Sequence, residues 1–237
     1  MSEPISMTAA PTDLTARLDA MLAALAASPR VRVHRQKRRS LSKRSASLDA
    51  VVRDLAESDI ALHPALQRCW LPFAEYAVHW ESASAKDEVV GGEIMVSYLY
   101  DVASNETDLI TADTPAAQQA VLRGLRVIDD QPQGGNGTLA GIRLIDGTLA
   151  PDTWFFDARR GLFALELNYC EYLDAMITTK GGYGWQYLFT EIDLTHRDNQ
   201  NLQTELRRLL DFLSEAFPED DYRELRERFA KRTSHRK

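Results

Sequence analysis

The feature that most constrains the fold is a run of strand-type segments in the middle of the chain, broken by turn residues. Strands are expected over 76–80, 93–100, 138–146, 153–157 and 162–167, each rich in β-branched or aromatic residues or alternating in polarity. Asp146-Gly147 predicts a turn, and residues 158–161 join the last two strands as a hairpin. These segments predict a sheet at the centre of the protein.

Helical spacing of apolar residues flanks the strands on both sides. Helices are expected after a cap at Thr12, over 47–57, from Pro64 to Trp70, over 114–125, from a cap at Asn168, over 198–217 and from Glu219 into the basic tail. Asn168 and Glu171 match a capping box, and Gly181-Gly182 suit a left-handed helix end. The expected fold class is α+β, a mixed or mainly antiparallel sheet with packed helices and extra N- and C-terminal helices.

The distribution of charge predicts the organisation of the N-terminal part. The chain carries a net charge of −7, yet eight basic residues and no acid lie between Arg30 and Arg44. This run lacks helical periodicity and predicts a solvated linker, with an electrostatic contact to an acidic partner or nucleic acid as the alternative. Aromatic residues that would stack on bases are absent from the run, so nucleic acid is the less favoured partner. We therefore expect an N-terminal helix and basic linker over 1–45, a main domain over 46–196 and a C-terminal helical extension over 197–237.

Cysteine usage and the N-terminus bear on the location of the protein. No apolar run approaches the roughly 20 residues that span a bilayer, and the first residues do not resemble a secretory signal. Cys69 and Cys170 lie far apart in sequence within apolar patterns, which favours reduced, buried thiols over a disulfide. A cytoplasmic protein without a membrane contact is expected.

The sequence predicts no catalytic, metal or cofactor site. The five histidines include no pair at i, i+4, and Cys-x-x-Cys is absent. The glycines at 135 and 137 precede an expected strand, whereas a dinucleotide site needs a helix there. An enzyme that uses Cys69 or Cys170 as a nucleophile, or the carboxylates of Glu166, Glu171 and Asp174, remains the alternative. We expect Glu171 to belong to the helix cap, Glu166 to lie on an exposed strand face and Asp174 to lie on the solvent side of its helix.

Residues 181–189 alternate glycines with large aromatic side chains directly after a predicted helix. A structural interpretation has Trp185, Leu188 and Phe189 closing the core. A functional interpretation makes Tyr183 and Tyr187 anchors for a partner, since aromatic residues are enriched at interfaces.

Several short motifs resemble those of the SUKH superfamily, which contains bacterial toxin-immunity proteins and fungal regulators of cell-wall synthesis. The motifs are Leu62-His63-Pro64-Ala65-Leu66, Val78-His79-Trp80-Glu81, Gly92-Glu93-Ile94, Glu171-Tyr172-Leu173 and Gly184-Trp185-Gln186-Tyr187-Leu188-Phe189. The chain departs from that family by having Ala74-Glu75 where a glycine turn commonly precedes the tryptophan strand. The resemblance covers 48–194 and implies helices packed on a sheet, and a binder without catalytic residues.

From this resemblance and the acidic composition we expect a non-catalytic protein-binding module, an immunity protein or related regulator whose partner is a protein such as a basic toxin. Complementary charge speeds such associations. The expected binding face lies beside the first strands, with a loop as a second contact and the two tyrosines as alternative anchors. These residues are Asp87, Glu88, Glu93, Asp101, Asp129, Asp130, Tyr183 and Tyr187.

Overall fold

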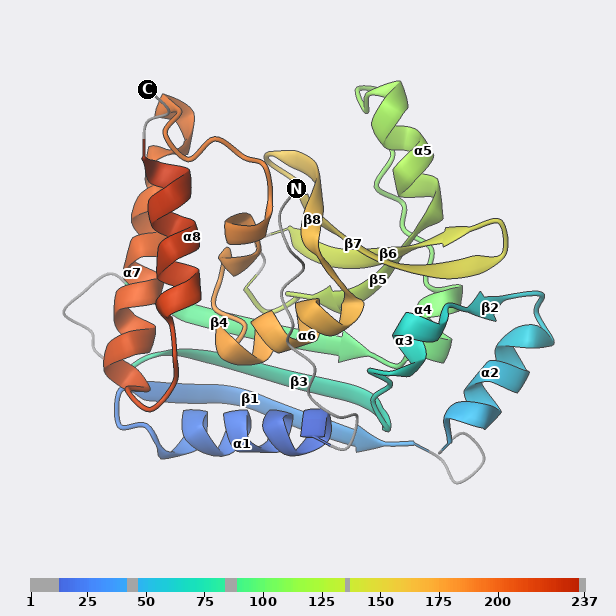
Figure 1. Ribbon diagram of the computed structural model, residues 1–237, viewed down its shortest axis with the longest axis horizontal. Helices are drawn as coiled ribbons and strands as arrows, with labels where there is room; N and C mark the ends of the chain where they lie inside the picture. Colours follow the sequence, from blue (N-terminus) through green and yellow to red (C-terminus); the bar gives the residue numbers. More distant parts are fainter. Residues whose placement is uncertain (1–12, 42–46, 84–88, 135–136, 235–237) are drawn as a thin grey trace.

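A computed structural model of the chain describes residues 13–41, 47–83, 89–134 and 137–234 (Figure 1). The strands are β1 (Val31–Ser40), β2 (Ala61–Leu62), β3 (Phe73–Ser82), β4 (Gly91–Ser97), β5 (Leu125–Asp130), β6 (Thr138–Ile145), β7 (Thr148–Asp157) and β8 (Gly161–Asn168). The helices are α1 (Asp13–Ala27), α2 (Leu48–Ala56), α3 (Pro64–Gln67), α4 (Leu99–Ser104), α5 (Ala116–Gly124), α6 (Tyr169–Thr178), α7 (Gln200–Ala216) and α8 (Arg223–Thr233), with short 3-10 helices η1 (Trp185–Phe189) and η2 (Arg197–Asn199). The expected cap at Thr12 lies outside the described residues.

The eight strands form one curled, mostly antiparallel sheet in the order β1-β3-β4-β5-β6-β7-β2, with β8 also paired to β7. β2 pairs with β7 in parallel, which makes the sheet mixed. Between β4 and β5 the register contains one pair, Val96 with Asp129. The sheet therefore consists of two well-paired groups, β1-β3-β4 and β5-β6-β7-β8, that meet at a narrow junction.

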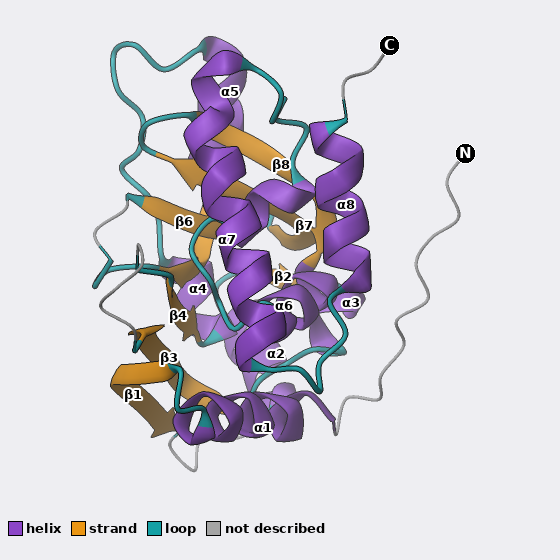
Figure 2. Ribbon diagram, turned by 90° about the vertical axis from the view of Figure 1, so that its left-hand side faces the viewer, coloured by secondary structure: helices purple, strands orange, loops and turns teal. Residues whose placement is uncertain are grey.

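The helices surround this sheet and share its core (Figures 1 and 2). α1 lies along β1, α6 lies in the curl of the sheet, and α7 and α8 pack side by side. Leu18 of α1, Trp80 of β3 and Leu213 of α7 are fully buried in one hydrophobic cluster. The predicted α+β class with additional terminal helices is confirmed, and the N-terminal helix α1 and the C-terminal helices α7 and α8 all contribute to the main core.

The predicted capping box at the start of α6 is confirmed. The Asn168 side chain accepts from the backbone N–H groups of Cys170 and Glu171 at 2.9 and 3.2 Å, and the Glu171 carboxylate accepts from the Asn168 N–H at 2.8 Å. The chain leaves the helix through Gly181, whose φ is 65° and where a Cβ would lie 2.3 Å from Ile94. η1 follows and buries Trp185, Leu188 and Phe189, so the structural interpretation of this segment is confirmed.

The prediction of a solvated linker over 30–44 is wrong for residues 31–40, which form the edge strand β1. β1 pairs antiparallel with β3, and the Glu75 carboxylate of β3 lies 2.7, 3.6 and 3.8 Å from the side-chain nitrogens of Lys37, Arg35 and Arg39. The hydrogen bond from Lys37 lowers the pKa of Glu75. The basic run is stabilised by acids on a strand that follows much later in the chain, which periodicity within the run cannot reveal.

The prediction of two reduced thiols is also wrong, because Cys69 and Cys170 form a disulfide with a Cα–Cα distance of 5.5 Å. Cys69 follows the short helix α3, and Cys170 lies in the first turn of α6. These two helices pack against each other, so residues separated by 101 positions become neighbours. The spacing of the two cysteines in the sequence does not predict this contact between α3 and α6.

Two further elements differ from the sequence-based expectation. Residues 125–130, expected as the end of a helix and a loop, form β5, because Leu125 and Ile128 are buried against the rest of the sheet. β4 ends at Ser97, and α4 begins at Leu99, where a continuing strand was expected. Among the described helices, none combines the length and the apolar content that crossing a membrane requires.

Candidate functional site

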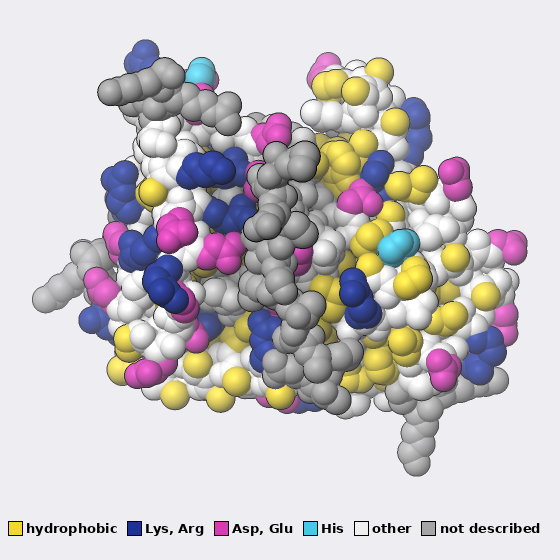
Figure 3. All heavy atoms as spheres, in the orientation of Figure 1, with side chains coloured by type: hydrophobic (Ala, Val, Ile, Leu, Met, Phe, Trp, Pro, Cys, Tyr) yellow, Lys and Arg dark blue, Asp and Glu magenta, His cyan; other side chains and the backbone are white. Residues whose placement is uncertain are grey.

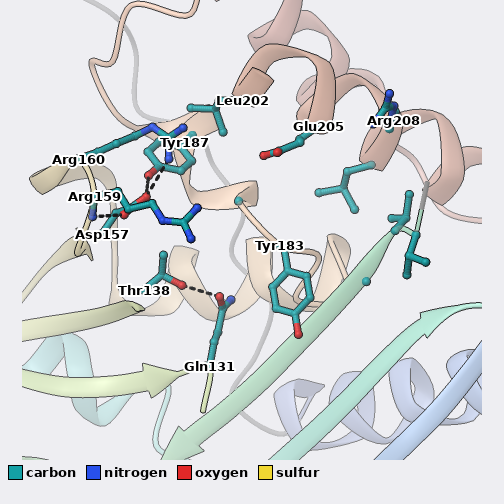
Figure 4. A pocket seen from close by; sticks show the side chains of 15 residues that line it. Gln131, Thr138, Asp157, Arg159, Arg160, Tyr183, Tyr187, Leu202, Glu205 and Arg208 are labelled. Atoms are coloured by element: carbon teal, nitrogen blue, oxygen red, sulfur yellow. Dashed lines mark hydrogen bonds and ion pairs between the residues drawn. The ribbon is translucent and has the colours of Figure 1, made fainter. Parts of the chain in front are cut away.

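A cavity of about 330 Å³ lies between the β7–β8 turn, η1, α7 and the start of β4 (Figure 4). Its walls include charged, polar and aromatic side chains together with the leucines of α7. The side chains labelled in Figure 4 are Gln131, Thr138, Asp157, Arg159, Arg160, Tyr183, Tyr187, Leu202, Glu205 and Arg208. A cavity of this size, with a few polar groups that converge on it, has the general character of a binding site.

Glu93 holds one rim of the cavity. Its side chain is 3% exposed and comes from β4. The carboxylate accepts from the backbone N–H of Gln133 at 2.8 Å and from the N–H of Gly134 at 2.7 Å. Hydrogen bonds from backbone N–H groups to a carboxylate are stronger than those between neutral groups, so the segment 131–134 is fixed to the sheet.

Tyr183 forms the wall beside this rim. A Cβ on Gly134 would lie 2.5 Å from the Tyr183 hydroxyl oxygen, so the ring packs directly on the glycine backbone. Burial, with the nearby negative charge of Glu93, raises the pKa of Tyr183, which keeps the phenol neutral. The half-buried ring is thus a fixed apolar surface facing the cavity.

Asp157 organises the opposite rim, at the turn between β7 and β8. Its carboxylate accepts from the backbone N–H of Arg159 at 2.7 Å, from the Arg160 guanidinium at 3.1 Å and from the Tyr187 hydroxyl. The Arg160 guanidinium also lies 5.6 Å from the centre of the Tyr187 ring. Burial, followed by the hydrogen bond to Asp157, raises the pKa of Tyr187. One buried carboxylate therefore fixes the turn that carries both arginines.

Asp129 stabilises the junction between the two strand groups. Its carboxylate, 2% exposed, accepts from the backbone N–H of Met95 on β4 at 2.8 Å and from the Tyr172 hydroxyl of α6 at 2.7 Å. Burial raises the pKa of Asp129 to about 7, against the lowering effect of these two hydrogen bonds. The Asp129 side chain thus adds hydrogen bonds to β4 and α6 at the single registered pair between β4 and β5.

The structure separates the acidic residues that the sequence placed on one face. The predictions that Glu93 lies on the surface, that Asp129 lies in an exposed loop and that Tyr187 is an exposed anchor are wrong, because all three side chains are buried. Asp130 is half-buried, and its carboxylate accepts from the N–H of Gln131. The packing of neighbouring apolar residues places these three side chains inside the protein. The mixed polarity of the sequence around them does not indicate which side of each segment faces inward.

Asp101 stays exposed, beside a second hollow lined by Arg39 and Glu75. Partial burial raises its pKa, and the positive charge of Arg39 lowers it. Asp87 and Glu88 lie outside the described residues. Among the predicted site residues, Tyr183 and Tyr187 line the cavity, Glu93 fixes the neighbouring segment 131–134, and Asp101 lies apart from them.

The charges on the face shown in Figure 3 are of both signs. Over α7 and α8, Lys and Arg side chains lie between Asp and Glu side chains. Arg228 and Arg232 of α8 bind Glu166 at 2.8 and 2.6 Å. The net negative charge of the chain is therefore not collected into a single acidic area on this face.

The three carboxylates weighed as catalytic candidates have structural partners. Glu166 binds the two α8 arginines, Glu171 belongs to the capping box, and Asp174 binds Arg17 of α1 at 2.5 Å. The prediction that Asp174 faces solvent is wrong, since α1 covers it and its side chain is 14% exposed. In the described part of the chain, no three His, Cys, Asp or Glu side chains are grouped as a metal site would need.

Sequence reasoning missed most of the side chains around the cavity. The sequence indicates only loop, strand and turn positions for Gln131, Thr138, Asp157, Arg159 and Arg160. The aspartate at the end of β7, two residues before the first arginine, is a local signal for a side chain that binds turn N–H groups. The sequence around Gln131 carries no comparable signal, because its environment is built by β6 and Tyr183.

Comparisons with known proteins leave the family of the chain open. No family model, no curated protein and no solved structure matches it.

Proposed function

We propose that this chain is a non-catalytic protein-binding module of the immunity-protein or regulatory type, which acts by binding its protein partner. The observation that carries the proposal is the rigid framing of one cavity by two buried carboxylates. Glu93 fixes the segment 131–134, and Asp157 fixes the turn 158–160. Loops held on a rigid scaffold are common carriers of recognition, and preorganised loops lose less entropy on binding.

The ionisable groups around the cavity support binding over catalysis. Asp157 is engaged by Arg160, Tyr187 and a backbone N–H, and Glu93 is engaged by two backbone N–H groups. A general base must be able to reach a substrate proton, and these two carboxylates already accept structural hydrogen bonds. The resemblance of the motifs to SUKH proteins points to the same class of function.

Two alternative functions lose support from particular contacts. A cysteine nucleophile requires a free thiolate, whereas both cysteines are in the disulfide. A basic arm that docks on nucleic acid or another anionic partner requires accessible positive charge. Glu75 of β3 lies within 4.0 Å of three of the cations on β1, and Asp19 binds Arg38 at 2.8 Å.

The cytoplasmic location remains a prediction, and the disulfide weighs against it. Structural disulfides persist in oxidising compartments and are rare where thioredoxin and glutathione keep thiols reduced. Rapid acid quenching of cells, followed by alkylation and a gel-shift assay, measures the thiol state directly. A fully reduced pair would agree with the cytoplasm, and a fully oxidised pair would contradict it.

The proposal is tested by isolating a partner and mapping the contact. The tagged full chain is used at low ionic strength, the recovered protein is identified by mass spectrometry, and the complex is reconstituted from purified components. Gln133 lies on the exposed side of the segment 131–134, and we expect Gln133→Arg to raise the dissociation constant of the complex about tenfold or more.

The matched control is Gln36→Arg, which changes an exposed glutamine of β1 away from the cavity. It should leave the affinity unchanged. If the partner is toxic when produced alone, co-expression of the wild-type chain should restore growth. Failure to recover any specific partner, or equal weakening by both variants, would contradict the proposal.

A further inference from the structure

The floor of the cavity contains a buried hydrogen-bond donor without an acceptor. Gln131 is 4% exposed, and its Oε1 accepts from the Thr138 hydroxyl at 2.6 Å. Its Nε2 has no hydrogen-bond partner within the described part of the chain. Figure 4 shows this amide at the base of the cavity, beside Thr138 and facing the space in front of Tyr183. A buried donor without a partner costs free energy, and an oxygen atom on the cavity floor would supply its missing acceptor.

An arginine side chain reaches into the same space. The turn held by Asp157 directs the Arg159 guanidinium toward the centre of the cavity (Figure 4). Arg159 is exposed, and no carboxylate of the described residues lies within ion-pair distance of it. Its neighbour Arg160 differs, because Asp157 neutralises it at 3.1 Å. The uncompensated positive charge of this rim is therefore that of Arg159.

We propose that the cavity binds an oxyanion, the carboxylate or phosphate group of a small molecule, between Gln131 Nε2 and the Arg159 guanidinium. Both groups are donors only, and a guanidinium forms its strongest hydrogen bonds with carboxylate and phosphate oxygens. The volume of about 330 Å³ falls within the range of small-molecule sites. The Tyr183 ring and Leu202 provide apolar walls for the remainder of the ligand. This inference does not depend on the protein partner proposed above.

Glu205 of α7 restricts which ligands fit. Its carboxylate points into the cavity from the wall opposite Gln131 (Figure 4). A second negative group on the ligand would be repelled there, and a cationic group would be attracted. The site therefore favours a ligand whose single anionic end lies at Gln131 and Arg159.

The experiment is a titration of the full-length, ¹⁵N-labelled protein with inorganic phosphate and, separately, with acetate, followed by NMR. Sodium chloride at matched ionic strength serves as the reference. We expect saturable shifts of the Gln131 side-chain amide and of the backbone amides of 131–134 and 158–160. Saturation by phosphate alone identifies a phosphorylated ligand, and saturation by acetate alone identifies a carboxylate. The absence of any saturable shift with both anions would overturn the proposal.

Variants then place the anion. Gln131→Glu keeps the size of the side chain and replaces the donor with an acceptor, so the affinity should fall by at least about tenfold. Arg159→Ala should cause a similar loss, while Arg68→Ala, at an exposed arginine beside α3, is the matched control and should bind as wild type. Glu205→Gln should leave the affinity equal or increase it. Wild-type affinity in both Gln131→Glu and Arg159→Ala, with folding confirmed by circular dichroism, would place the anion elsewhere and refute the site.

Discussion

Removal of the disulfide should destabilise the protein by an amount set mainly by the length of chain that it closes. Cys69 and Cys170 are separated by 101 positions. For a loop of about 100 residues, the entropy lost by the unfolded chain corresponds to about 4.7 kcal/mol at 25 °C. For a protein of this size about 1 kcal/mol shifts the midpoint by about 2 to 4 °C, so the full effect is a decrease of about 9 to 19 °C.

The folded state should survive this change. In the variant, the segment around Cys69 remains packed on the core because Leu66 is fully buried, and α6 retains its capping box. The double variant Cys69→Ser/Cys170→Ser should therefore unfold cooperatively but at lower temperature and lower urea concentration. The assay is thermal and urea unfolding of both proteins, with and without reductant. Reductant should lower the wild-type midpoint toward that of the variant and leave the variant unchanged.

The reasoning is refuted if the unfolded, unreduced wild-type protein reacts with two equivalents of a thiol reagent. It is also refuted if wild type and variant unfold at the same midpoint in the absence of reductant. Either result would show that the two cysteines contribute no cross-link to the unfolded chain. The same thiol titration provides the control for complete reduction.

Three further perturbations test separate parts of the fold. Because the native pKa of Asp129, about 7, is above the unfolded value near 3.8, its contribution to stability is fully present below about pH 4 and is lost as pH rises through 7. The free energy of unfolding of Asp129→Asn, measured with urea, should therefore rise relative to that of wild type by up to about 1.4 kcal/mol per pH unit between pH 5 and pH 7. A difference in unfolding free energy that does not change with pH would contradict this. Trp185→Ala, at a fully buried ring, should cost about 3 to 5 kcal/mol, and an unchanged melting temperature would contradict its burial. Limited trypsin digestion should spare the Lys and Arg residues of 31–40, because β1 is paired with β3, and early cleavage there would show that the strand is open.

Local signals predicted the parts of the fold that depend on neighbouring residues. The capping box between Asn168 and Glu171 is a short-range device that marks the start of α6 correctly, and the helix ends at Thr178, shortly before the predicted stop at Gly181. The strands 138–145 and 161–168 follow from alternation and turn residues in the same way. Each of these elements contains most of its own determinants.

The remaining features depend on partners distant in sequence. The sequence of β1 predicts a linker because Glu75, which pairs with its basic residues, belongs to another strand. The disulfide forms because α3 packs on α6. The cavity is formed by several segments that are distant in sequence, so Gln131 becomes a candidate only when β6 and Tyr183 lie beside it. The buried positions of Glu93 and Asp129 likewise reflect hydrogen bonds to backbone groups that no local pattern specifies.

The position of β1 at the edge of the sheet has a consequence for self-association. Within the described residues, no strand pairs with the outer side of this ten-residue strand, which therefore offers hydrogen-bonding groups to another extended chain, including a second copy of itself. Antiparallel pairing of two such edges would set Arg and Lys side chains of one copy against those of the other, and like charges directly opposite each other are destabilising. The basic residues of β1 thus oppose edge-to-edge pairing of two copies at this edge of the sheet, and we expect their replacement by neutral residues to make the protein less soluble.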